Sequence, residues 1–104
     1  MPYSKIIELI AKATETSKDD KKELAKIYAD IEYYLGYTDS QEKKKLFAKL
    51  TKIKKHLQTK VKMGYIKKED ALAESAVYDK VMTIIEKAYN GKIEITSDDL
   101  KPTF

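Results

Sequence analysis

The only histidine in the chain is the residue best suited to covalent phosphoryl chemistry. His56 stands among lysines, with Lys52 and Lys55 before it and Lys60 after it. An exposed imidazole can carry a phosphoryl group, and a lysine four residues further along a helix can help to hold it. His56 lies off the apolar stripe of its predicted helix, so we expect its side chain in solvent.

This arrangement is similar to that of histidine phosphotransfer domains, but the residues that follow the histidine differ. Gln58, Thr59 and Lys62 stand where that family has a small residue and a glycine. Larger side chains at these positions would hinder the approach of a phosphorylation partner. We therefore interpret His56 as a solvated surface residue and expect its replacement to leave function intact.

No other set of residues predicts a catalytic, cofactor or metal site. The chain has no cysteine, which excludes disulfides and thiolate metal ligands. A Glu-x-x-His metal pair does not occur, because Ile53 stands three residues before His56. There is no glycine-rich phosphate loop, and no arginine of the kind with which chorismate mutases, another class of small helical enzyme, hold their substrate. We expect a protein that is not an enzyme and has no cofactor.

Lysine supplies all 21 basic residues, and the net charge is +4. Many of these lysines fall between residues 43 and 62, where Glu42 is the neighbouring acid. A lysine attracts anions but lacks the planar two-pronged donor with which arginine reads bases, so sequence-specific nucleic-acid recognition is not expected. A solvated helix face is one interpretation; the other is contact with an anionic surface such as the inner membrane leaflet. The residues assigned to that contact are Lys52, Lys55, Lys60 and Lys62.

Four amphipathic segments position these residues. The first follows Ser4, a predicted N-cap, and ends near Thr16; the second begins after Asp19 or Asp20 and ends at Gly36. The third and longest begins with a predicted capping box formed by Asp39 and Glu42 and ends at Gly64. A turn over residues 65–67 precedes the fourth, which Asn90 and Gly91 end.

These segments predict an all-α fold in one domain. Residues 1–91 are expected to form an antiparallel up-and-down four-helix bundle, because short connections make successive helices neighbours. Residues 92–104 are expected to form a short irregular C-terminal tail, either packed on the bundle or extending from it. The chain has neither a signal peptide pattern nor a run of about 18 apolar residues, so we expect a cytoplasmic protein, as a monomer.

The fourth helix is apolar over a wide arc. Val77, Val81 and Ile84 are expected to close the core, which leaves a second apolar flank. Core packing is one interpretation of that flank, and a surface for the tail or a partner protein is the other. The candidate partner-binding residues are Tyr78, Met82, Ile85, Tyr89, Leu100 and Phe104.

The chain resembles class IIa bacteriocin immunity proteins of the enterocin A immunity type. The resemblance lies in the order of the four segments, the long lysine-rich third helix, the turn at Gly64-Tyr65-Ile66 and the short tail. The most similar segments are Glu23 to Leu35 and Lys62 to Tyr89. The resemblance implies a cytosolic bundle that protects a producer from its own pore-forming peptide. It also implies that the protein engages the toxin-bound mannose phosphotransferase system from inside, with specificity in the C-terminal half.

A different function is also compatible with the sequence. The lysine-rich third helix could bind nucleic acid without sequence specificity, as in a phage-type regulatory protein. Such binding would weaken steeply with salt.

Overall fold

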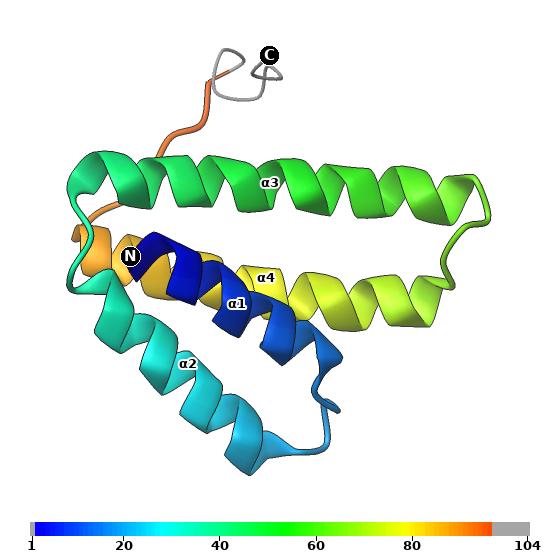
Figure 1. The fold of residues 1–104 in the computed structure, drawn as a ribbon. Helices are drawn as coiled ribbons and strands as arrows, with labels where there is room; N and C mark the ends of the chain where they lie inside the picture. Colours follow the sequence, from blue (N-terminus) through cyan, green and yellow to red (C-terminus); the bar gives the residue numbers. More distant parts are fainter. Residues whose placement is uncertain (1, 97–104) are drawn as a thin grey trace.

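The computed structural model describes residues 2–96, which form four α-helices joined by short connections (Figure 1). The helices are α1 (Pro2–Glu15), α2 (Lys21–Leu35), α3 (Ser40–Lys62) and α4 (Lys68–Tyr89). No strand occurs in this part of the chain. The all-α prediction is confirmed.

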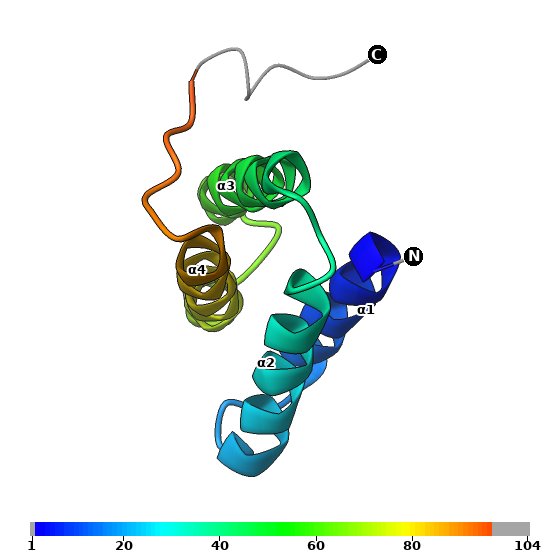
Figure 2. The ribbon, with the colours of Figure 1, turned by 90° about the vertical axis from the view of Figure 1, so that its left-hand side faces the viewer.

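The helices pack as two antiparallel hairpins. α1 lies against α2 and α3 lies against α4, while α4 also contacts both α1 and α2. Figures 1 and 2 show the α1–α2 pair set obliquely across the α3–α4 pair. The result is the predicted antiparallel bundle, and the end of the α3–α4 hairpin extends beyond α1 and α2 (Figure 1).

Local side chains set the helix starts. The Asp39 carboxylate accepts a 2.7 Å hydrogen bond from the Glu42 amide, and the Glu42 carboxylate accepts one from the Asp39 amide, which forms the predicted capping box. Asp20 caps α2 through the Glu23 amide. The prediction for α1 is wrong, because the helix already includes Pro2, ahead of Ser4. Proline is well tolerated there, since the first turn of a helix has no use for its missing amide.

The helix ends use glycine less than predicted. α2 ends at Leu35 as expected, but Gly36 has a φ of −61° in the right-handed region, which any residue can adopt. Gly64 does adopt the left-handed conformation, with a φ of 79°. At the end of α4 this conformation belongs to Asn90, with a φ of 69°. Asparagine is the residue after glycine that most readily takes it.

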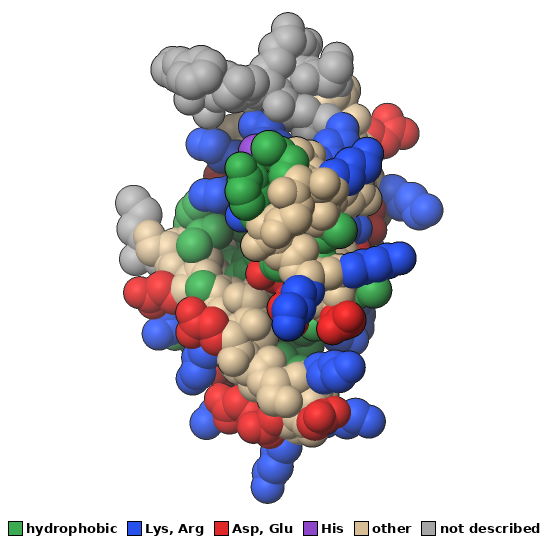
Figure 3. Space-filling view, turned by 90° about the vertical axis from the view of Figure 1, so that its right-hand side faces the viewer, with side chains coloured by type: hydrophobic (Ala, Val, Ile, Leu, Met, Phe, Trp, Pro, Cys, Tyr) green, Lys and Arg blue, Asp and Glu red, His purple; other side chains and the backbone are tan. Residues whose placement is uncertain are grey.

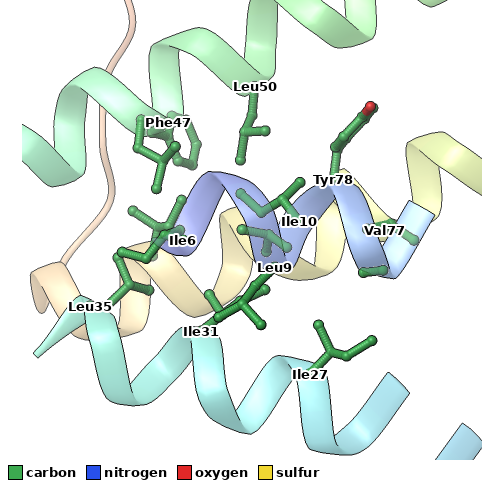
Figure 4. Packing of buried hydrophobic residues seen from close by; sticks show 14 of the residues in the cluster. Ile6, Leu9, Ile10, Ile27, Ile31, Leu35, Phe47, Leu50, Val77 and Tyr78 are labelled. Carbon is green, nitrogen blue, oxygen red and sulfur yellow. The ribbon is translucent and has the colours of Figure 1, made fainter. Parts of the chain in front are cut away.

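The core draws on all four helices. Ile6, Ile31, Leu50 and Ile85 each come from a different helix and are at most 1% exposed. Figure 4 shows the side chains of α1, α2 and α3 pointing into the same interior. Burial of such side chains is the main stabilising contribution in a chain without disulfides.

The core continues past the last helix. Ile93 is only 7% exposed, and its amide donates a 3.0 Å hydrogen bond to the Glu86 carboxylate. Ile95 packs against the same core. The start of the tail therefore lies on the bundle and adds to its core. Residues 97–104 lie outside the described part of the chain.

Candidate functional site

The face that α4 turns to the core includes Val77 and Val81 as predicted and extends to Tyr78 and Ile85. Tyr78 is 8% exposed and Ile85 is fully buried, as the core-packing interpretation of this flank requires. Met82 and Tyr89 are half-buried beside them. Because α4 packs against α1, α2 and α3, its wide apolar arc is used inside the bundle.

Two candidate residues cannot be placed. Leu100 and Phe104, expected to cover the α4 flank or to bind a partner, lie outside residues 2–96. Of the six candidates, Met82 and Tyr89 retain accessible surface in the described structure. Any partner contact at Tyr78 or Ile85 would require the bundle to open.

The lysines of α3 fall into two groups. Lys43 is buried, and its ammonium donates a 2.6 Å hydrogen bond to the Thr38 carbonyl in the α2–α3 turn. Lys54 forms an ion pair with Asp79 of α4. These two lysines make contacts within the fold and are not part of a free basic face.

The lysines assigned to an anionic surface lie on the outer side of α3. Lys55, Lys60 and Lys62 are exposed, and Lys52 is half-buried. His56 is exposed between them, as predicted. The outer side of α3 is therefore basic without being a recognisable site, because the side chains spread along several turns.

A groove between α2 and α4 is the first surface feature that the sequence did not reveal. Its volume is about 600 Å³. Leu24 and Tyr28 of α2 and Ile84 of α4 supply its partly buried apolar residues, and burial raises the pKa of the Tyr28 hydroxyl. The other residues that line the groove are Lys21, Ala25, Ala29, Glu32, Lys80, Thr83 and Lys87.

The only sequence signal for this groove is a pair of small residues. Ala25 and Ala29 are spaced i, i+4 beside the apolar side chains of α2 and are exposed. The spacing puts both on one side of the helix. The partner helix could not be inferred, since α2 and α4 are not consecutive.

The second feature is the end of the α3–α4 hairpin. The large hydrophobic residues Met63, Tyr65 and Leu72 are 60%, 74% and 62% exposed. Figure 3, which faces this end, shows hydrophobic side chains with lysines around them. A second groove, of about 320 Å³, runs from Leu72 between the two helices towards Leu57.

The third feature is an aromatic cluster at the end of α2. The Tyr33 ring makes edge contacts with Tyr34 and Tyr37, with ring centroids 5.2 Å and 5.3 Å apart. The Tyr33 and Tyr37 hydroxyls are 3.2 Å apart, and Tyr33 is 60% exposed. These tyrosines pair with one another on the surface.

Residues 2–96 contain no group of three or more histidine, cysteine, aspartate or glutamate side chains that could hold a metal ion. None of the helices within this range is long and apolar enough to cross a membrane. Comparison with protein-family models, with curated proteins and with solved structures finds no match to this chain. The candidate functional surfaces in the described part of the chain are the two grooves and the hairpin end.

Proposed function

We propose that the chain is a non-enzymatic binding protein of the class IIa bacteriocin immunity type. It protects a cell from a pore-forming peptide by engaging the toxin-bound mannose phosphotransferase receptor from the cytoplasmic side. The observation that carries this proposal is the groove between α2 and α4. One of its walls is α4, which belongs to the C-terminal half, where the resemblance locates specificity, and the other wall is α2.

The groove has the character of a helix-binding surface. Leu24, Tyr28 and Ile84 can receive the apolar face of an amphipathic helix. Ala25 and Ala29 are small, which lets the backbone of a docked helix come close. Both properties are needed, because a bound helix must bury an apolar stripe at short range.

The rim of the groove indicates the charge of the partner. It carries Lys21, Lys80 and Lys87 against one acid, Glu32. An acidic amphipathic helix would complement this charge, and the complementarity would favour its encounter and orientation. We therefore assign the groove to an acidic helical segment of the receptor complex.

The arrangement of the helices is consistent with this proposal. The chain has four antiparallel helices with a long α3 and a tight turn before α4, as the resemblance implies for an immunity protein. This agreement concerns architecture, which many unrelated bundles share. The groove is the more specific support.

The test is a protection assay in a bacteriocin-sensitive host. The double variant Ala25→Glu/Ala29→Glu fills the groove and neutralises its rim without removing core side chains, since both alanines are exposed. We expect loss of protection with an unchanged melting temperature. Ala11→Glu, at an exposed position of α1, is the matched control and should protect like the wild type.

Two results would count against the proposal. Full protection by a folded double variant would remove the groove from the mechanism. Failure of the wild type to protect against any class IIa peptide would remove the immunity assignment itself.

Non-specific nucleic-acid binding is the second candidate. Its support is the set of exposed lysines on α3, including Lys55 and Lys60. Its predicted signature is a binding constant for duplex DNA that falls steeply between low and moderate salt. Binding that is weak at every salt concentration would exclude it.

A further inference from the structure

Exposed apolar side chains concentrate at one end of the molecule. Five large hydrophobic residues are exposed in the described chain, and Met63, Tyr65 and Leu72 all lie where α3 joins α4. We call residues 60–72 the hairpin tip. Neither α1 nor α2 reaches it, because the α3–α4 hairpin extends beyond them (Figure 1). Surface hydrophobic residues gathered in this way mark interaction sites more often than scattered ones do.

The backbone holds Tyr65 outward. The Tyr65 amide donates a 2.9 Å hydrogen bond to the Lys60 carbonyl, and the Gly64 amide donates one of 3.1 Å to the Val61 carbonyl. These bonds form a Schellman motif, in which the residue at the Tyr65 position usually packs an apolar side chain back on the helix. Here Tyr65 is exposed instead, and the residue at the helix position that this side chain would usually contact is Lys60. The Tyr65 ring is thus exposed although the turn that carries it is regular and fully hydrogen-bonded in the Schellman pattern.

The hairpin tip is also basic. Lys60, Lys62, Lys67 and Lys68 are exposed, and within residues 2–96 none of them forms an ion pair. The acids of the tip are Glu69 and Asp70 in the first turn of α4. Four lysines against two acids leave an excess of positive charge around the three apolar residues.

The start of α4 adds hydrogen-bond donors to the positively charged hairpin tip. The last carbonyl groups of α3 receive backbone hydrogen bonds in the turn, whereas no side chain caps the first amides of α4. The N-terminus of a helix favours anions. The tip therefore presents amides and ammonium groups next to exposed apolar side chains.

We propose that the hairpin tip docks on an anionic phospholipid surface. Tyr65, Met63 and Leu72 enter the interfacial layer, where tyrosine is a preferred residue because its ring is apolar and its hydroxyl is polar. The four lysines contact the headgroups. A projecting end suits a flat bilayer, and the lysines need no defined geometry there. Such docking is reversible, since it involves neither a lipid anchor nor a membrane span.

This proposal concerns a different surface from the α2–α4 groove and holds whether or not the chain confers immunity. It also differs from the predicted contact along α3, which involved lysines alone. Lys60 and Lys62 belong to both sets, while Lys52 and Lys55 lie further along α3 from the turn.

The chain has no tryptophan, so a single substitution gives a site-specific reporter. Tyr65→Trp is mixed with vesicles of phosphatidylglycerol and phosphatidylcholine, or with vesicles of phosphatidylcholine alone. We expect a blue shift of its emission, and quenching by brominated acyl chains, with the anionic vesicles only. Tyr33→Trp places the same reporter at another exposed position, on α2, and should show neither change.

A second pair of variants tests the contribution of the apolar residues. Met63→Ser/Tyr65→Ser/Leu72→Ser should weaken binding to the anionic vesicles roughly tenfold or more, as measured by co-sedimentation. Tyr33→Ser/Tyr37→Ser removes two other exposed rings and should leave binding unchanged.

Three outcomes would overturn the proposal. The first is an unshifted Tyr65→Trp emission with anionic vesicles, and the second is an equal shift from both reporters, which would indicate non-specific adsorption. The third is burial of Tyr65→Trp in a protein dimer without vesicles, visible as concentration-dependent sedimentation.

Discussion

The Tyr78 hydroxyl donates a 2.8 Å hydrogen bond to the Glu74 carboxylate, one turn earlier on the same helix. The ring of Tyr78 belongs to the core, so the hydroxyl is the only part of the side chain that requires a polar partner. Burial and the neighbouring carboxylate raise the pKa of Tyr78 well above its ordinary value of 10.0. The pair explains how the polar hydroxyl of a core tyrosine is accommodated inside the bundle.

This pKa shift predicts a dependence of stability on alkaline pH. Since the folded chain holds the Tyr78 proton more tightly than the unfolded chain, the contribution is complete below about pH 10 and is lost as the pH rises above it. Tyr78→Phe removes the ionising group, so its free energy of unfolding should fall less than that of the wild type between about pH 9 and pH 11. Urea unfolding across this range is the measurement. Tyr65→Phe, which removes an exposed hydroxyl, is the control, and its free energy of unfolding should change with pH as that of the wild type does. The same pH dependence in Tyr78→Phe as in the wild type would contradict the prediction.

Two neighbouring core positions of α3 should differ in their sensitivity to truncation. Leu50 is 1% exposed, whereas Ile53 is only partly buried. Leu50→Ala should therefore lower the free energy of unfolding by about 2–5 kcal/mol, and Ile53→Ala by less. Denaturant unfolding of both variants tests the order. A larger loss for Ile53→Ala would mean that the packing of α3 differs from that described.

The tail contributes to stability through Ile93. Ile93→Ala should cost about 2–5 kcal/mol because the side chain is buried in the core beyond the last helix. Glu94→Ala, at the exposed next position, should change the stability by at most about 0.5 kcal/mol. Removal of all residues after Gly91 is therefore expected to destabilise the bundle, so a loss of protection by that truncated form would not by itself identify a binding role. Equal stability of Ile93→Ala and the wild type would show that the tail start is dispensable.

Gly64 and Gly91 should respond in opposite directions to alanine. At Gly64 the φ of 79° strains any side chain, so Gly64→Ala should destabilise by about 1–2 kcal/mol although nothing obstructs the added methyl group. Gly91 has no left-handed φ and open space around it, so Gly91→Ala should stabilise by about 0.4–1 kcal/mol. Thermal melting of the two variants checks both signs. Stabilisation by Gly64→Ala would argue against the turn that presents Tyr65.

The sequence predicts those features of this fold that depend on neighbouring residues. The capping box of Asp39 and Glu42 is an example, because both partners lie within one turn and their side chains have few alternatives. The ends of α2 and α3 follow for a similar reason. Gly36 shows the limit: a glycine at a helix end permits the left-handed conformation without requiring it.

The face of α4 and the α2–α4 groove depend on tertiary contacts and could not be predicted. A narrow apolar stripe has one possible orientation, but on α4 the apolar arc runs from Val77 through Tyr78 to Ile84, so several orientations bury a similar area. Packing against three helices selects the orientation that buries Tyr78 and Ile85. The groove arises where two non-consecutive helices meet, which the local pattern does not specify.

The extension of the α3–α4 hairpin beyond the other two helices divides the molecule into regions of unequal cooperativity. After Leu57 no residue of α3 is buried, and before Val77 only Ala71 of α4 is. Few interior contacts oppose separation of the two helices there, so this end should open in sub-global fluctuations while the remainder stays folded. Amide hydrogen exchange should be faster at residues 58–62 and 69–75 than at residues 46–50 and 81–85. The hairpin tip, proposed to meet a bilayer, would then be the part of the protein least protected from exchange. Contact with vesicles would slow exchange there, because the tip would have to leave the vesicle before it could open.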